Sequence, residues 1–281
     1  MSQAHHGGGI AKASQEFGLP AEALLDFSAN INVFAPSISS EAWERWRTEI
    51  IRYPEADAES MRQRLAAVYG VNADHILPTA GAIEGLYLAA RLFTNLEGGV
   101  TTTLGGSAPF GTSLTPGVVG APASRSVKVG IIEPSFSDYT RAFEATGIQP
   151  ERIVLPPELW HRPVQDWAHL LEPFDVIVLG NPNNPTGGLQ SRTQLCELFS
   201  RAWARPKAWI VDEAFIEFVA GDETLLGVPH PSLLVLRSLT KSWAIPGLRL
   251  GFVATTNPQW IEQLGLMQPP WSINAPAASW A

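Results

Sequence analysis

Residues 238–251 read SLTKSWAIPGLRLG and place a lysine shortly after an apolar run. The run spans Leu233 to Leu236 and lies between Pro231 and a hydroxyl-bearing segment, as expected for a buried strand. Lys241 is therefore predicted to lie where the strand leaves the sheet. Burial of a lysine is costly. A lysine at this position either extends its amine to solvent or takes part in chemistry.

The residues around Lys241 suit a phosphate group and an amine-reactive cofactor. Ser238 and Thr240 supply hydroxyls before the lysine, and Arg249 supplies a cation after it. These groups could bind a phosphate while the amine forms a Schiff base, as a pyridoxal-phosphate (PLP) enzyme requires. The alternative is a strand-end lysine paired with a carboxylate, and this motif alone does not decide between the two.

Composition limits the class of protein. The chain has 281 residues, of which 45% are hydrophobic and 16% charged, enough for one large α/β domain or two smaller ones. A net charge of −8 argues against a nucleic-acid-binding surface. The single cysteine, Cys196, rules out a disulfide framework and fits a cytoplasmic location. No run of apolar residues is long enough to predict a membrane span, and no signal peptide is expected.

Strands and helices are expected to alternate along the chain. Apolar runs predict strands at 127–132, 175–180, 208–212, 233–238 and 248–254. Helical spacing predicts helices at 40–51, 59–69, 83–93, 194–203 and 258–267. This alternation predicts βαβ units, and therefore an α/β fold with a mostly parallel sheet and flanking helices.

Two of these helices carry apolar stripes that we expect in the core. Ser40 is the predicted N-cap of the first helix, and Gly70 is predicted to end the second. The stripes consist of Trp43, Trp46, Ile50 and Ile51 in the first helix and of Met61, Leu65 and Val68 in the second. A short strand is also expected within 24–32. Residues 97–126, rich in small and polar residue types, are expected to be a disordered insertion.

Polar candidates follow three of the predicted elements. The turn at 81–83 opens a helix, whose free N–H groups could bind a phosphate, although an ordinary strand–helix turn is equally compatible. Asn184 lies in the rigid loop NPNNPTG (181–187), at the carboxyl end of a strand, where α/β sheets bind ligands. Asp212 ends the next strand, and beside the ring nitrogen of PLP it would keep that nitrogen protonated.

Three further candidates have simpler alternatives. His6 lies in HHGGG (5–9), which could approach an anion but also fits a tag remnant or a flexible tail. Asn30 and Asn32 could both face a ligand, or could stabilise a turn. Phe136 could stack on a flat ring or pack against the next helix.

Taken together, three motifs resemble a known pattern. NPNNPTG (181–187), DEAF (212–215) and SLTKSWAIPGLRLG (238–251) occur in this order in the fold-type I PLP enzymes of the aspartate aminotransferase superfamily. The resemblance covers nearly the whole chain except 97–126. It implies the large PLP-binding domain of that superfamily.

Other segments are similar to one group within the superfamily, the threonine-phosphate decarboxylases of cobalamin biosynthesis. These segments are HHGGGI (5–10), LLDFSANIN (24–32), RYPEAD (52–57) and QPPWSINA (268–275). Phe215 stands where histidinol-phosphate aminotransferases usually carry tyrosine. The resemblance implies PLP-dependent decarboxylation of O-phospho-L-threonine to (R)-1-amino-2-propanol phosphate. The alternatives are an aminotransferase of the histidinol-phosphate type and a non-catalytic remnant.

The resemblance also implies roles for individual residues. Lys241 would form the Schiff base, Asp212 would pair with the pyridine nitrogen, and Asn184 would bind the phenolic oxygen. Phe136 would stack on the ring. The cofactor phosphate would be held by Ser238, Arg249 and the backbone at Gly81, Ala82 and Ile83.

Further roles concern the substrate and a second subunit. Tyr53 would reach the cofactor phosphate of the neighbouring subunit, which implies a homodimer. The small phosphorylated amino-acid substrate would lie against His6, Gly7, Asn30 and Asn184. No metal, nucleic acid or membrane takes part in the expected function.

The chain departs from the superfamily pattern in two respects. Ala82 and Ile83 stand where a hydroxyl or an acid is usual, so only backbone donors remain in that turn. The second departure concerns the domain organisation.

The expected domains are an N-terminal arm at 1–40, the PLP-binding domain at 41–257 and the start of an interdomain helix at 258–281. The C-terminal small domain of the superfamily, which carries the arginines that bind the substrate, is not in this sequence, so we expect this chain to be weakly active or inactive.

Overall fold

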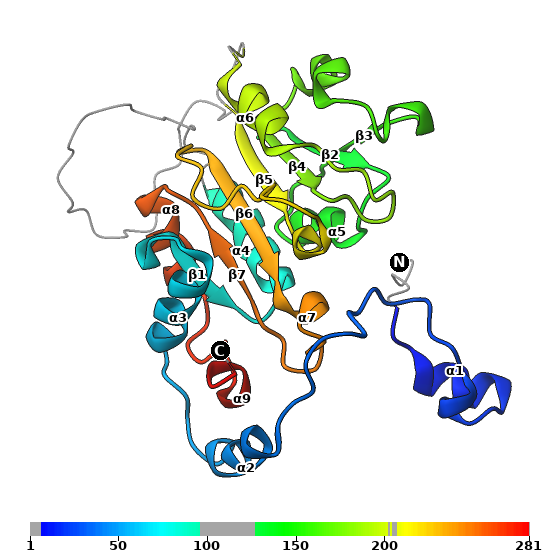
Figure 1. Ribbon diagram of the computed structural model, residues 1–281. Coiled ribbons are helices and arrows are strands. Elements are labelled where there is room, and N and C mark those ends of the chain that lie inside the picture. Colours follow the sequence, from blue (N-terminus) through cyan, green and yellow to red (C-terminus); the bar gives the residue numbers. More distant parts are fainter. Residues whose placement is uncertain (1–6, 96–126, 202, 204–206, 281) are drawn as a thin grey trace.

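The computed structural model describes residues 7–95, 127–201, 203 and 207–280. The expected disordered insertion at 97–126 and the candidate His6 lie outside the described residues. Seven strands form one sheet in the order β1-β7-β6-β5-β4-β2-β3 (Figure 1). The strands are β1 (Ile76–Thr79), β2 (Val129–Glu133), β3 (Glu151–Val154), β4 (Val176–Gly180), β5 (Ala208–Asp212), β6 (Leu233–Ser238) and β7 (Gly251–Ala254).

The sheet is mostly parallel, as the sequence predicts. Strands β3, β2, β4, β5 and β6 pair in parallel, so their carboxyl ends lie at one edge. Strand β7 runs antiparallel to both β6 and β1. Every residue of β4, β5 and β6 is buried, as in a sheet covered on both faces.

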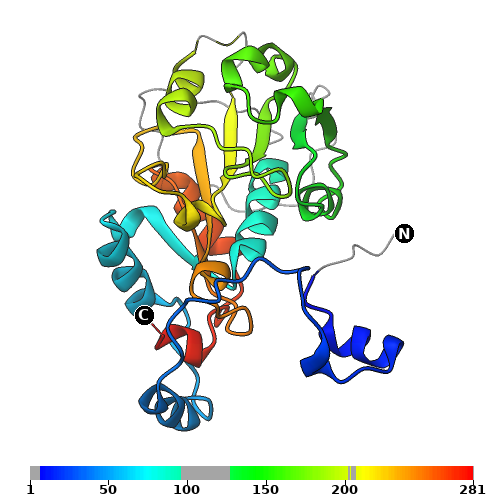
Figure 2. The ribbon, with the colours of Figure 1, turned by 45° about the vertical axis from the view of Figure 1, so that its right-hand side comes forward.

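Helices cover both faces of the sheet (Figures 1 and 2). Along β4, Val176 and Val178 join one apolar core, and Ile177 and Leu179 join the other. The first core includes α4 (Ala82–Asn95), α5 (Asp138–Glu144) and α8 (Pro258–Met267). The second includes α3 (Glu59–Tyr69) and α6 (Arg192–Ser200). None of the helices in the described part of the chain is long and apolar enough to cross a membrane.

The remaining helices lie near the ends of the chain or beside the sheet edge. They are α1 (Ile10–Phe17), α2 (Ser40–Glu49), α7 (Leu239–Ser242) and α9 (Ala275–Ala278). Helix α1 buries no residue and lies away from the sheet in both views (Figure 2). Helix α2 packs against α9 rather than against the sheet.

Three expectations for the N-terminal region are wrong. Residues 24–32 form no strand, because they find no neighbouring strand to pair with, and Leu25 and Phe27 are 87% and 90% exposed. The N-cap of α2 is Ser39, whose hydroxyl accepts from the Ala42 amide at 3.2 Å, and not Ser40. The apolar stripes of α2 and α3 are only partly buried, because α2 does not pack on the sheet and α3 is half-exposed. Trp46, Met61 and Leu65 are buried, while Trp43, Ile50, Ile51 and Val68 are exposed.

Element boundaries differ in two other places. The strand expected at 248–254 begins only at Gly251, because Arg249 has a φ of 55°, which a strand does not accommodate. Helix α6 begins earlier than expected, at Arg192, because Ser191 and Gln194 form a capping box. Gly70 ends α3 in a left-handed conformation, as predicted. The sequence analysis does not identify the two edge strands, β1 and β3, and β3 is exposed except for Ile153.

Gly251 allows β7 to pass close to the turn before α4. A Cβ at this position would lie 2.4 Å from the Arg237 carbonyl oxygen and 2.8 Å from the Ala82 nitrogen. Both contacts are with backbone atoms, which cannot rotate away.

We therefore predict that Gly251→Ala lowers the free energy of unfolding by about 1–3 kcal/mol, through overpacking. Urea unfolding followed by circular dichroism measures this change. Gly265→Ala in α8 is the matched control, because no atom lies within 4 Å of the added Cβ. Alanine there should be neutral or stabilising. Equal stability of the two variants would contradict the prediction.

Candidate active site

A cavity of about 550 Å³ lies at the carboxyl edge of the parallel strands. It opens where β4, β5 and β6 end, and α4 begins beside it. Ten of the predicted site residues line it: Gly7, Asn30, Ala82, Ile83, Phe136, Asn184, Asp212, Ser238, Lys241 and Arg249. Residues that are far apart in the sequence thus meet in one concave site of the size typical for a small ligand.

Asp212 is a buried acid of the cavity. Its Oδ2 accepts a hydrogen bond from the Tyr139 hydroxyl at 2.9 Å, and its Oδ1 accepts from the Ala214 amide at 2.9 Å. Burial raises the pKa of Asp212, while these hydrogen bonds and the charge of Lys241 act in the opposite direction. Such a carboxylate gains most from a cationic partner, such as a protonated pyridine nitrogen.

Lys241 carries the candidate nucleophile. It lies in the four-residue helix α7, directly after β6. Burial lowers the pKa of Lys241, and the positive charge of Arg249 lowers it further, whereas Asp212 raises it. A lowered pKa increases the fraction of free amine at neutral pH, which is the form that attacks a carbonyl.

A phosphate-binding set lies beside the lysine. The hydroxyls of Ser238 and Thr240 are 2.7 Å apart, and both residues line the cavity together with Arg249. Gly81 has a φ of 83°, and a Cβ there would lie 2.9 Å from Arg249 Nη2, so the glycine lets the guanidinium approach the turn. Helix α4 begins at this turn and adds unpaired N–H donors. Hydroxyls, a guanidinium and a helix N-terminus form a donor set that suits a phosphate.

The asparagines of the 181–187 loop divide into two kinds. Asn181 is buried and exchanges hydrogen bonds with Gln190, through both its amide nitrogen and its oxygen. Asn183 donates to the Pro134 carbonyl and to the Thr186 hydroxyl, both at 2.8 Å. These bonds hold the loop in place, and Asn184 lines the cavity.

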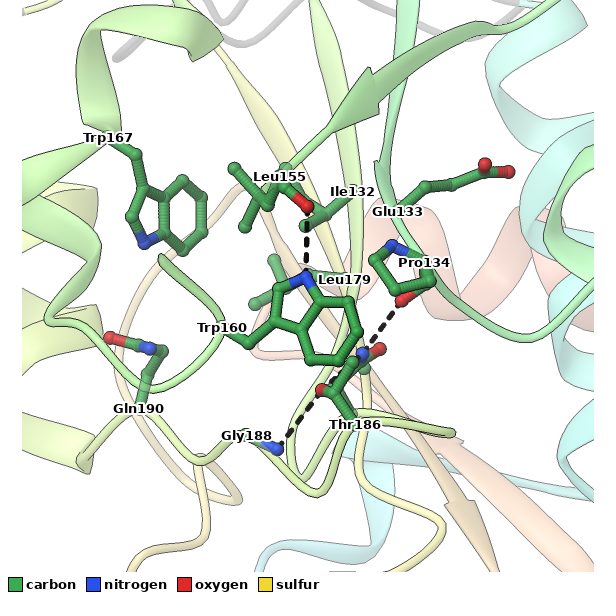
Figure 3. Close-up of a pocket in the computed structure, with 12 residues that line it drawn as sticks. Ile132, Glu133, Pro134, Leu155, Trp160, Trp167, Leu179, Thr186, Gly188 and Gln190 are labelled. Carbon is green, nitrogen blue, oxygen red and sulfur yellow. Dashed lines mark hydrogen bonds between the residues drawn. The ribbon is translucent and has the colours of Figure 1, made fainter. Parts of the chain in front are cut away.

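A second, much smaller cavity is lined in part by Asn183 and Thr186 of this loop (Figure 3). Trp160 and Trp167 line it, and Trp160 donates to the Leu155 carbonyl at 2.9 Å. Its volume of about 30 Å³ matches roughly one water molecule. The space is therefore too small for a cofactor.

The face of the sheet opposite Asp212 carries a separate ionic network. Glu213 follows Asp212 directly and is fully buried. It pairs with Arg237 at 3.2 Å and accepts from Thr224 and from the Leu225 amide, both at 2.6 Å. Arg237 also pairs with Glu217 at 2.8 Å. Glu213 therefore has a structural role, whereas Asp212 faces the cavity.

Gly7 and Tyr53 differ in their position relative to the cavity. Gly7 lines the cavity, and the next amide, of Gly8, donates to the Ser28 hydroxyl at 2.9 Å. Tyr53 does not line this cavity; it is 84% exposed and packs against Trp271, with ring centroids 5.2 Å apart. Its expected contact with a neighbouring subunit therefore stays a prediction.

Sequence reasoning missed Tyr139 as a site residue. Phe136 packs edge-to-face against Tyr139 of the next helix, with ring centroids 5.7 Å apart. Phe136 also lines the cavity. Tyr139 follows three residues later, on α5, and reaches Asp212. The short spacing between two aromatic residues after the end of a strand could have indicated that both face the site. Tyr87, Asp138 and Phe215 also line the cavity.

Comparison with known proteins gives consistent similarities. A family model described as aminotransferase class I and II matches residues 119–281. The threonine-phosphate decarboxylase of Salmonella typhimurium is 32% identical over 277 residues, or 97% of this chain and 68% of that protein. A histidinol-phosphate aminotransferase of Mycobacterium tuberculosis is 31% identical over 257 residues, or 90% of this chain and 59% of that protein.

A solved structure shares the fold. The L-threonine-O-3-phosphate decarboxylase from Porphyromonas gingivalis matches with a TM-score of 0.69 and 22% identity. The match covers 89% of this chain and 68% of that one. The chain thus spans between 59% and 68% of the length of these three proteins.

We predict that Tyr139→Phe weakens PLP binding about tenfold at neutral pH, since a hydrogen bond to a charged group is lost. Without the hydroxyl the pKa of Asp212 rises further, so more of the carboxyl is protonated and cannot hold a pyridinium. The loss of affinity should therefore grow as pH falls. Titration of the protein with PLP, followed by absorbance across a pH series, measures this effect.

Tyr69→Phe is the matched control for this prediction. The Tyr69 hydroxyl also donates to a carboxylate, that of Glu217, but on the far side of the sheet from the cavity. This variant should leave the pH dependence of PLP binding unchanged. A parallel response of the two variants would show that the Tyr139 bond has no specific role.

Proposed function

Because the chain belongs to the aminotransferase class I and II family, we propose that it forms part of a PLP enzyme that decarboxylates O-phospho-L-threonine. The product would be (R)-1-amino-2-propanol phosphate, an intermediate of cobalamin biosynthesis. The observation that carries the proposal is the joint position of Lys241, Asp212 and a phosphate-binding set in one cavity.

Pyridoxal 5′-phosphate is the cofactor of this family, and when bound it supplies an electron sink for bond cleavage at the substrate Cα. The cavity fits it. We propose that Asp212 faces the pyridine nitrogen, Phe136 the ring and Asn184 the phenolic oxygen. Ser238, Arg249 and the turn of Gly81, Ala82 and Ile83 hold the phosphate, although Ala82 and Ile83 offer only their backbone amides.

Lys241 has two tasks in this proposal. Its free amine, favoured by the lowered pKa, attaches the cofactor. Protonated to the ammonium by the proton that the substrate amine gives up on binding, Lys241 would then donate this proton to the substrate Cα, from which carbon dioxide leaves. The reaction balances, because the bonding pair left by the carboxylate carbon takes up this proton.

The choice of bond separates decarboxylation from transamination. A decarboxylase holds the bond from Cα to the carboxylate perpendicular to the cofactor ring, whereas an aminotransferase holds the Cα–H bond there. We propose that Gly7, Asn30 and Asn184, together with His6, orient the substrate. Phe215 supports the decarboxylase, since the alternative group usually places a tyrosine hydroxyl at this position.

The second candidate is an aminotransferase of the histidinol-phosphate type. Its support is sequence identity: the chain is 31% identical to a histidinol-phosphate aminotransferase and 32% identical to a threonine-phosphate decarboxylase. Lys241 could move a proton at Cα in either reaction. A homodimer also belongs to the proposal, because Tyr53 is exposed and does not line the cavity of its own chain.

We predict that the PLP-loaded protein releases carbon dioxide from O-phospho-L-threonine and forms (R)-1-amino-2-propanol phosphate without a keto acid. The measurement uses protein and substrate in similar amounts, with carbon dioxide trapping and mass spectrometry of the products. Histidinol phosphate with 2-oxoglutarate is the parallel assay. Glutamate formation in that assay, without carbon dioxide from phosphothreonine, would establish the aminotransferase instead.

We also predict that Lys241→Ala abolishes the absorbance change that the wild-type chain gives with PLP and prevents borohydride from attaching the cofactor. Lys12→Ala, which removes an exposed amine on α1, is the control and should behave as wild type. Retained attachment in Lys241→Ala, confirmed by peptide mapping, would place the reactive lysine elsewhere.

A further inference from the structure

Within the described part of the chain, Asn32 joins the N-terminal segment to the turn that carries Lys241 by two hydrogen bonds. Its backbone amide donates to the Lys241 carbonyl at 3.0 Å, and its side-chain Nδ2 donates to the Ser242 carbonyl at 2.8 Å. Its Oδ1 accepts from the Phe34 amide at 2.9 Å, which closes a local turn. Figure 2 shows the N-terminal segment passing directly beside α7.

Helix α7 depends on outside partners because it is only four residues long. A single helical turn is unstable by itself, since nucleation fixes several residues for few hydrogen bonds. Its first amide, that of Leu239, donates to the Leu250 carbonyl at 3.1 Å. Its last two carbonyls, those of Lys241 and Ser242, both accept from Asn32, and the Lys241 carbonyl also accepts from the Ala244 amide at 3.3 Å.

The segment around Asn32 has few other anchors among the described residues. Leu25, Phe27, Val33 and Phe34 are 84–93% exposed, so apolar burial contributes little to its position. Asn30, two residues before Asn32, lines the cavity. One asparagine therefore connects the candidate substrate-binding side of the cavity with the turn that carries the candidate nucleophile.

We propose that Asn32 is a positioning residue that holds the Lys241 turn in register with the N-terminal segment. The proposal rests on Lys241 being the reactive lysine, but not on which reaction the protein catalyses. Removal of the side chain lets α7 move outward and carries the Lys241 amine toward solvent. The amine then loses part of the desolvation that favours its neutral form.

The test measures Lys241 itself, in the chain without cofactor or substrate. The wild-type chain and Asn32→Ala are acylated with acetic anhydride across a pH series, and each lysine is quantified by peptide mass spectrometry. Normalising the rate at neutral pH to the plateau at high pH removes differences in accessibility. The titratable and charged groups that share this cavity are Tyr87, Asp138, Tyr139, Asp212 and Arg249, and none is altered.

We expect the normalised rate of Lys241 in Asn32→Ala to fall about fivefold, because the pKa of a more exposed amine returns toward its ordinary value. Asn257→Ala is the matched control. Asn257 also bridges a remote carbonyl, that of Pro231 at 2.9 Å, and a local amide, that of Gln259 at 3.1 Å, but at the start of α8. It should leave the Lys241 profile unchanged.

Lys207 reports whether the fold itself has opened. It is 4% exposed and donates to three backbone carbonyls, so it should stay unreactive in every folded variant. If Asn32→Ala exposes Lys207, Asn32→Ser replaces it, because serine keeps the local turn but does not reach Ser242. A wild-type Lys241 profile in a folded variant overturns the proposal, whatever the substrate assays give.

Discussion

The burial of the Asp212 carboxylate near the half-buried amine of Lys241 is the constraint on which the site depends. An acid and a base that leave water together lose hydration, and the loss is offset only where their positions are fixed. The parallel strands β4, β5 and β6 fix them, because their carboxyl ends meet at one edge. Tyr139 and the Ala214 amide then complete the hydrogen bonds of the carboxylate. The surrounding cavity follows from this arrangement.

The fold class and most of the cavity were predictable because they depend on local patterns. Fully apolar runs such as 176–180 have no stable location except a covered sheet, and polar residues directly after such runs must gather at its edge. Asp212, Asn184 and Lys241 were candidates on this basis, and their individual roles came from the resemblance of the three motifs to a known superfamily. The antiparallel direction of β7 could not, because an apolar run does not encode the direction of its partner.

The wrong predictions for the N-terminal helices and the missed Tyr139 both concern contacts between residues that are distant in the sequence. The stripe of Trp43, Ile50 and Ile51 has helical spacing, but α2 lies beside α9 and only Trp46 of the stripe is buried. Periodicity indicates which residues share a face and does not indicate what covers that face. Tyr139 was missed for the same reason, since its bond to Asp212 joins residues of α5 and β5 that are distant in the sequence.

Glu213 directly follows Asp212, the last residue of β5, and the two carboxylates lie on opposite faces of the sheet. If β5 slipped by one residue against its neighbours, every side chain would change face. Glu213 would then be lost to Arg237, which would keep only Glu217 as an ionic partner among the described residues. A misregistered chain is thus penalised by charge as well as by packing. The doublet of adjacent acids thus links the position of Asp212 in the cavity to the ion pair of Glu213 with Arg237 on the other face.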